Sequence, residues 1–161
     1  MGLDVGTKFI GVAVSDEGCY LSFPVKTIRR DGYNNIPSVS SDLSKIIRKH
    51  HVQCAVLGVP TSEVEKQERI IEYMSAVWDH GKLAIPVVLQ DESYSTMQVL
   101  EEITGTKGKM VSGTMLRNQV KKMSNYEKAL TDQMSAMNIL DRGLKVLRNY
   151  IDFDGKLKSR K

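Results

Sequence analysis

The sequence predicts an α/β fold, in which three antiparallel strands and then parallel strands form a mixed sheet with helices on both faces. Extended segments follow one another over residues 1–28 with no helical spacing between them, which is typical of hairpins. Beyond Gly32, helical stretches alternate with short apolar segments, which is typical of parallel β-α-β units. The length of 161 residues suits one domain, expected at residues 1–150, with a basic tail at 151–161.

The first part of the chain predicts strands alone. A short strand over Met1–Val5 precedes Phe9–Ser15, where apolar and small residues alternate as they do in a strand. After a tight turn, Cys19–Phe23 and Val25–Ile28 are two further extended pieces on either side of Pro24. Strands that follow one another without a helix pair as hairpins, so this part of the sheet is expected to be antiparallel.

The second part predicts helices between buried strands. A helix ends near His50, and Cys54–Gly58 is a continuously apolar strand of the kind that is buried on both faces. A capping box at Ser62–Glu65 opens a second helix, and Ile85–Leu89 is another buried strand. The apolar stripes of the two helices are Val39, Leu43, Ile46 and Ile47, and then Ile70, Ile71, Met74, Val77 and Trp78.

Two more helices are expected towards the end of the chain. Ser95–Gln98 caps a third helix that continues through Ile103. Ser124–Glu127 is a capping box for the last and longest helix. The apolar stripe of this helix is Leu130, Met134, Met137, Leu140, Leu144 and Leu147. Ser135 and Ala136 are small, which would let their face of the helix approach a sheet closely.

Composition narrows the classes of function. Hydrophobic residues make up 41% and charged residues 26% of the chain, which favours a folded globular protein. The net charge of +4 weakly favours a polyanionic partner. No apolar run is long enough to span a bilayer, so no membrane partner is expected. Two cysteines cannot build a disulfide framework, which favours the cytoplasm, or an organelle stroma or matrix if a targeting segment has been removed.

Four carboxylates stand where a sheet protein can place a site. Asp4 lies within the first strand, Asp91 and Glu92 follow the strand Ile85–Leu89, and Asp132 is early in the last helix. The plain alternative for each is a solvated strand end or a helix cap. Asp4 fits that alternative worst, because a buried carboxylate needs a partner or a cation.

Carboxylates that converge from strand ends and a covering helix repel one another and raise each other's pKa. A divalent cation relieves this repulsion and generates a nucleophile from water. Oxygen-only ligands favour Mg²⁺ or Mn²⁺ over zinc. Such a cluster therefore indicates metal-assisted hydrolysis of a phosphodiester.

Basic residues add a second indication. They gather before the last helix, at Lys107, Lys109, Arg117, Lys121 and Lys122. Beside an acidic cluster, they would hold a nucleic-acid backbone while metal ions engage the scissile phosphate. Near the N-terminus, Asp4 is followed by a Gly-Thr turn whose backbone N–H groups can hold phosphate, which adds Thr7 and Lys8 to the candidate contacts. The alternative for the basic stretch is a solvated loop.

Four motifs resemble one family in order and spacing over roughly residues 2–147. Gly2–Asp16 resembles the opening of the YqgF (RuvX) family of RNase H-like proteins, and Leu57–Pro60 is similar to its glycine–proline turn. Asp91–Thr96 resembles its Asp-Glu-Arg-x-Ser/Thr-Thr block, and Lys128–Ala136 resembles its C-terminal Asp block.

The resemblance implies an RNase H-like fold and a nuclease that matures precursors of small-subunit ribosomal RNA. It places Asp4, Glu92 and Asp132 at the acidic positions of the family, as catalytic metal ligands, with Asp91 second to them. Ser93 stands where the family usually has Arg, which removes a fixed donor to phosphate and makes activity an open question. The turn after Pro60 also departs from the family. The family has longer first strands than the three residues before Asp4, so the chain is expected to be a fragment or a mature form.

Three other functions remain open. A resolvase of four-way DNA junctions must cut two strands symmetrically and works as a dimer, whereas a nuclease acting on RNA is expected as a monomer or weak homodimer. A non-catalytic ribosome-associated module would explain Ser93 and the altered turn. An actin-like phosphotransferase would use the Asp-Val-Gly-Thr turn, but that fold needs two such domains.

Overall fold

The five-stranded sheet orders the molecule. A computed structural model describes residues 1–31, 35–92 and 124–150, and in these ranges the strand order is β3-β2-β1-β4-β5. β1 pairs antiparallel with β2 and β2 with β3, whereas β1 pairs parallel with β4 and β4 with β5. The predicted mixed sheet is confirmed. The strands are β1 Gly2–Val5, β2 Phe9–Ser15, β3 Ser22–Arg29, β4 Ala55–Val59 and β5 Val87–Asp91.

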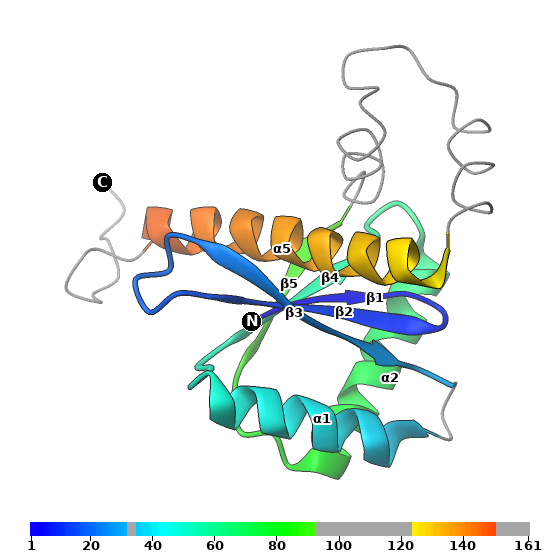
Figure 1. Ribbon diagram of the computed structural model, residues 1–161. Coiled ribbons are helices and arrows are strands. Elements are labelled where there is room, and N and C mark those ends of the chain that lie inside the picture. The colour runs from blue at the N-terminus through cyan, green and yellow to red at the C-terminus, as the bar shows by residue number, and fades with distance from the viewer. Residues whose placement is uncertain (32–34, 93–123, 151–161) are drawn as a thin grey trace.

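Helices cover both faces of the sheet, as the sequence predicts. α1 (Ile36–Lys49) and α2 (Val64–Gly81) lie below it and α5 (Asn125–Tyr150) lies above it in the view of Figure 1. Side chains alternate along each strand, so each face has its own core. The core under α1 and α2 is the larger, and includes Leu3, Val5, Ile10, Val12, Leu57 and Val59 from the sheet. The core under α5 is Ala13, Val56, Ala136, Ile139, Leu140 and Leu144.

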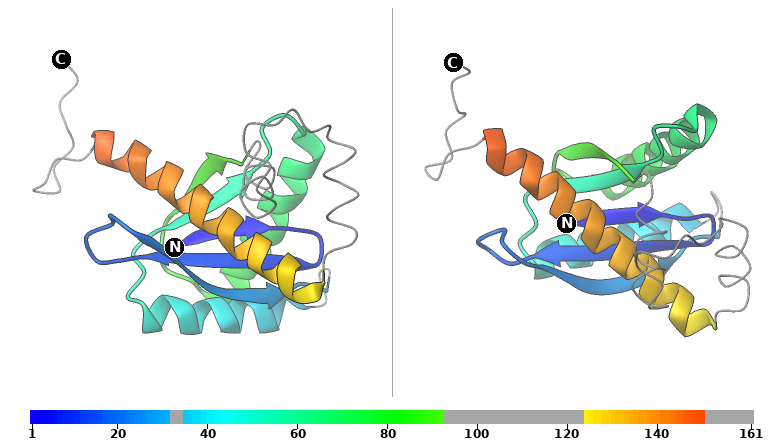
Figure 2. Two further views of the ribbon diagram at one scale, coloured as in Figure 1. Left: turned by 45° about the horizontal axis from the view of Figure 1, so that its top comes forward. Right: turned by 90° about the horizontal axis from the view of Figure 1, so that it is seen from above.

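Glycines line the face under α5. A Cβ atom at Gly2 would collide with the backbone carbonyl of Ala136, and one at Gly11 would collide with that of Asp132. The helix backbone therefore rests directly on the strands, and Figure 2 shows it running obliquely across them. Ser135 and Ala136 are fully buried in this contact, which confirms the close approach expected of small residues.

The two extended pieces expected at Cys19–Phe23 and Val25–Ile28 are not separate strands, so that prediction is wrong: one strand, β3, runs over Ser22–Arg29, and residues 19–21 belong to the preceding turn. Val12 pairs with Lys26 and Ala13 pairs with Pro24, which leaves one extra residue on β3 in a bulge. Proline has no N–H to donate, but β3 is an edge strand, where a bulge and a proline are tolerated. The proline bends the strand without ending it.

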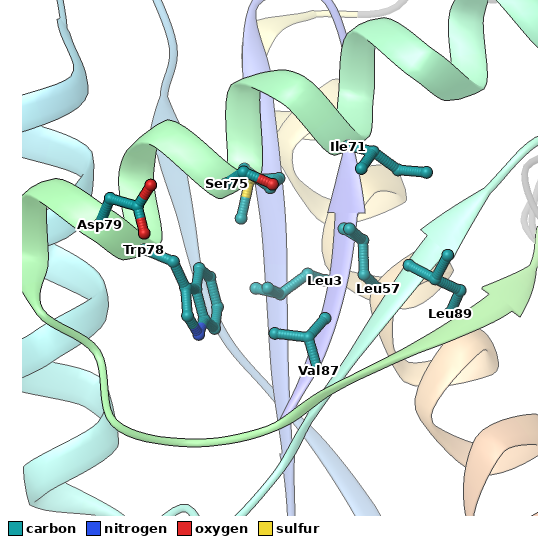
Figure 3. A pocket seen from close by; sticks show the side chains of 9 residues that line it. Leu3, Leu57, Ile71, Ser75, Trp78, Asp79, Val87 and Leu89 are labelled. Atoms are coloured by element: carbon teal, nitrogen blue, oxygen red, sulfur yellow. The ribbon is translucent and has the colours of Figure 1, made fainter.

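The prediction of a buried strand at Ile85–Leu89 is also wrong. β5 runs over Val87–Asp91, and its three apolar side chains are between 37% and 49% exposed. The apolar run is typical of a central parallel strand, but within the described ranges β5 is the edge of the sheet. Between β5 and α2 lies a cavity of about 240 Å³, which is lined by Leu57 and Leu89 of the sheet and by Ile71 and Trp78 of the helix (Figure 3).

The helix ends test the capping predictions. α1 ends at Lys49 with His50 as its C-cap, as expected. α2 begins at Val64 with Glu63 as its N-cap and with no side-chain cap, so the capping box at Ser62 is wrong. The box of α5 is confirmed, because the Ser124 Oγ accepts from the Glu127 N–H at 3.2 Å and the Glu127 Oε2 accepts from the Ser124 N–H at 2.7 Å.

The buried face of α5 differs from the predicted stripe. Leu130 is exposed, whereas Thr131 and Ser135 are buried. A helix that rests on glycines buries its small residues and turns some larger ones outward. The helix expected to continue through Ile103 lies outside the described residues. No helix in the described ranges is both long and apolar enough to cross a bilayer.

Candidate active site

Asp4 stands at the centre of the site, on the sheet face under α5. It pairs with Gly11 of β2, and because Leu3 pairs with Leu57 of β4, Gly58 follows on its other side. Asp4 is thus flanked by two residues without side chains. Its carboxylate is deep in the fold yet partly open to solvent, as a group that receives a ligand must be.

Asp132 approaches Asp4 over the first of these glycines. The α5 backbone at Asp132 contacts the position that a Cβ of Gly11 would occupy. Its carboxylate is partly buried, and its charge raises the pKa of Asp4. The last helix therefore brings a carboxylate to the middle of the sheet, as the sequence predicts.

Glu92 approaches Asp4 over the second glycine. Its backbone N–H donates to the Val59 carbonyl at 3.0 Å, so the β4–β5 ladder holds the residue at the carboxyl end of the sheet. The Glu92 Oε2 lies 3.1 Å from the position of a Cβ on Gly58, and it is buried with no hydrogen-bond partner among residues 1–31, 35–92 and 124–150. The Glu92 Oε1 lies 3.8 Å from the Lys66 Nζ.

Burial raises the pKa of all three carboxyl groups, and nearby negative charges raise the pKa of Asp4 and Glu92 further. The pKa of Asp4 rises to about 7, first through burial and then through the charges of Glu92 and Asp132. Burial raises the pKa of Asp132 to about 6. Burial also raises the pKa of Glu92, against the opposing effect of Lys66. The Ser135 hydroxyl lowers the pKa of Asp4, although it makes no hydrogen bond of normal geometry.

The donor set suits a hard divalent cation. All three groups offer only oxygen, and the Glu92 Oε2 is a buried acceptor that lacks a donor. Among the residues that the structure describes, no three acidic, histidine or cysteine side chains lie close enough together to hold one metal ion. The carboxylates are neighbours rather than a closed cage, and their like charges favour this separation.

The other predicted site residues lie around this cluster or outside the described ranges. Asp91 pairs with Val59, and its charge raises the pKa of Glu92. Thr7 and Lys8 are exposed on the β1–β2 turn, at the sheet end where Glu92 follows β5. The basic residues Lys107, Lys109, Arg117, Lys121 and Lys122, together with Ser93, fall outside the described ranges.

Sequence reasoning missed three residues of the site. Gly11 and Gly58 make room for the two outer carboxylates, and Lys66 contacts one of them. The signal for Lys66 was its place just after β4, because parallel strands direct their carboxyl ends to one edge. Nothing in its spacing links it to Glu92, which is far away in the sequence.

Comparisons with known proteins identify the family of the chain. The model of the RuvX family, described as "Holliday junction resolvase", matches residues 1–146. A protein of Oceanobacillus iheyensis is 34% identical, with 87% of this chain and 93% of that protein covered. One of Caldanaerobacter subterraneus is 32% identical, covering 68% of this chain and 81% of that protein. Both bear the name "Putative pre-16S rRNA nuclease".

A solved structure shares the fold. Thermus thermophilus RuvC in complex with a Holliday junction substrate aligns with a TM-score of 0.51 and 11% identity, over 91% of this chain and 93% of that one. At this identity the likeness concerns the fold alone, and it confirms the predicted sheet with its helices. The match over most of the sequence and the order of its motifs show that this chain belongs to the RuvX family.

Proposed function

We propose that the protein is a metal-dependent nuclease that hydrolyses phosphodiester bonds in the precursor of 16S ribosomal RNA. The observation that carries the proposal is the position of two carboxyl groups beside that of Asp4 on β1. They belong to Glu92, at the end of β5, and to Asp132 on α5. The names of the relatives point to the substrate. The cytoplasm is the place of action that we propose, with the protein as a monomer or weak homodimer.

Asp4, Glu92 and Asp132 would hold Mg²⁺ or Mn²⁺. A bound ion of this kind supplies an activated water and neutralises charge on the phosphate. The chain itself contributes a close-packed setting, because the glycine-lined strands let the α5 backbone rest directly on the sheet beside Asp4. With a pKa of about 7, Asp4 holds a proton over much of the range below neutral pH and must lose it to act as a ligand.

The substrate backbone would lie across the carboxyl end of the parallel strands. Thr7 and Lys8 are exposed there on the β1–β2 turn. The turn is held from inside, since the Gly6 N–H donates to the Phe9 carbonyl at 2.9 Å and the Arg30 Nη1 donates to the Gly6 carbonyl at 3.0 Å. Backbone N–H groups and a lysine on a fixed turn position a phosphate without reading sequence.

Asp132→Asn tests the proposal, with calorimetric titration of Mn²⁺ and cleavage of a 16S precursor as readouts. We expect the variant to lose both. Asp16→Asn is the matched control, because Asp16 only accepts the backbone N–H groups of Tyr20 and Leu21, and an amide oxygen can replace it. Full cleavage by the Asp132 variant would remove this carboxylate from the chemistry. Parent protein that takes up no Mn²⁺ would favour a non-catalytic binding module.

The second candidate is a resolvase of branched DNA. Two observations favour it: the description of the family and the RuvC structure with its junction. The two functions separate when one preparation is given a four-way DNA junction and a ribosomal RNA precursor. Symmetric cutting of the junction by a dimer in solution would favour the resolvase, and cleavage of the RNA alone would favour the nuclease proposed here.

A further inference from the structure

The two carboxylate oxygens of Glu92 have different surroundings. Oε2 is buried above Gly58, where no described residue forms a hydrogen bond with it, on the sheet face that carries Asp4. Oε1 lies 3.8 Å from the Lys66 Nζ. The side chain as a whole is only 13% exposed, so the direction in which each oxygen points decides what the carboxylate can bind.

Lys66 reaches this carboxylate from the opposite layer of the molecule. It belongs to the first turn of α2, the helix that covers the other face of the sheet. Its Nζ also lies 3.8 Å from the Glu63 Oε1, three residues earlier in the chain. One ammonium group thus stands between a carboxylate at the start of α2 and a carboxylate at the end of β5.

A cation in this position does more than neutralise charge. The backbone of Glu92 is fixed by its hydrogen bond to Val59. Its side chain can still rotate about several bonds, and such rotation would move Oε2 away from the position of a metal ligand. Without Lys66, the carboxylate would be buried with no ionic partner in the part of the chain that the structure describes, which favours its rotation towards water. The ion pair opposes that rotation by holding Oε1, and Oε2 then stays on the side of Asp4.

We propose that Lys66 is a positioning residue that holds the Oε1 of Glu92, so that Oε2 stays directed at the cluster around Asp4. The purpose of this tether rests on the proposed function, in which Glu92 is a metal ligand. Lys66 lies outside the reacting groups and acts through Glu92. Outer partners of metal ligands orient those ligands in the same way in other proteins.

A double-mutant cycle tests the tether without metal. Thermal unfolding is measured in a chelator for the parent, Lys66→Met, Glu92→Gln and the double variant. We expect Lys66→Met to lower the Tm by about 3 °C in the parent and by less than about 1 °C in the Glu92→Gln background. Equal losses in both backgrounds would overturn the proposal. Arg69→Met is the matched control, because among the described residues Arg69 pairs only with the exposed Glu65, and its effect should be the same in both backgrounds.

Calorimetric titration with Mn²⁺ alone tests the role of the tether. Lys66→Met should bind Mn²⁺ about tenfold more weakly, with a lower kcat and an unchanged KM. Lys66→Arg should restore binding to within about twofold, because it keeps the cation. Unchanged or tighter binding by Lys66→Met would overturn the proposal and would mark Lys66 as a competing cation. A parent protein that binds no Mn²⁺ would contradict the proposed function. The double-mutant cycle, which is measured in a chelator, tests the interaction between Lys66 and Glu92 independently of that result.

Discussion

The two faces of the sheet are built on opposite principles. Under α1 and α2, branched side chains such as Leu3 and Leu57 pack against Leu43 and Val77 in a continuous core. Under α5, glycines let the helix backbone touch the strands. Asp4 lies on this face, whereas its neighbours in β1, Leu3 and Val5, belong to the apolar core on the other face. One face supplies stability through buried area. The other gives up stability for chemistry, because it buries carboxyl groups that repel one another.

The largest effect is expected at Asp4, where stability and activity should change in opposite directions. The pKa of Asp4 is 3.8 in its ordinary state and about 7 in the folded chain. The folded state therefore binds more protons between these values, so its stability falls as the pH rises from about 4 to 7 and is then constant. Because asparagine does not titrate, Asp4→Asn removes this loss of folding stability, which amounts to at most roughly 4 kcal/mol above pH 7.

The measurement for Asp4→Asn is urea unfolding at pH 4 and pH 8, beside cleavage of the ribosomal RNA precursor. We expect the variant to gain stability at pH 8, to match the parent more closely at pH 4 and to lose cleavage. A loss of stability at pH 8 would mean that the buried carboxylate already has a satisfactory partner, and the contrast between the faces would then be wrong.

A pair of substitutions, one on each face, separates packing from chemistry. Leu43→Ala leaves a cavity in the fully buried core under α1 and should cost about 2–5 kcal/mol. Gly11→Ala forces α5 off the strands at Asp132 and should cost about 1–3 kcal/mol. Urea unfolding and Mn²⁺ titration then distinguish them. Leu43→Ala should bind Mn²⁺ like the parent, whereas Gly11→Ala should lose most of its affinity despite the smaller destabilisation.

The same contrast explains what could be predicted from the sequence. Alternation in β2 and helical spacing in α1 report on the large core, and both elements lie where those patterns place them. The acidic positions were identified from their places on and after the strands and on the last helix, and the resemblance to a family then ranked Asp4, Glu92 and Asp132 first. Periodicity failed for β5, because an apolar run does not say whether a strand is central or at the edge. It failed at Pro24 because a bulge resembles a strand end.

The face under α5 was harder to predict for a physical reason. Its contacts are made by backbone and by residues without side chains, so no hydrophobic pattern marks them. Gly11 and Gly58 flank Asp4 only because β1 lies between β2 and β4 in the sheet. Lys66 likewise joins Glu92 only across the end of the sheet. Such long-range neighbours follow from strand order, which local sequence patterns do not contain.

We expect pH to have a moderate effect on the affinity for Mn²⁺. This effect arises on the sheet face under α5, which we call the acidic face because it carries Asp4 and Asp132. Because the pKa of Asp4 is about 7 and that of Asp132 is about 6, a proton must leave before each carboxylate becomes a ligand. The affinity should rise about tenfold per pH unit between 6 and 7, more steeply below 6, and level off above 7. Titrations from pH 5 to pH 8 measure this, and a flat profile would mean that these two carboxyl groups are not ligands.

The smallest effect is expected at Ser135. This residue contributes both to the close packing of α5 on the sheet and to the pKa of Asp4. Its hydroxyl is buried beside Asp4 and lowers the pKa of that carboxyl group. Ser135→Ala removes this effect while keeping the small volume that lets α5 approach the sheet. The pKa of Asp4 should rise further, so the pH profile of Mn²⁺ binding should move upward by less than about one unit. Thermal unfolding at pH 5, where the folded parent and the variant both keep Asp4 protonated, should barely change. An unmoved profile would show that burial and the two neighbouring carboxylates alone set the pKa of Asp4.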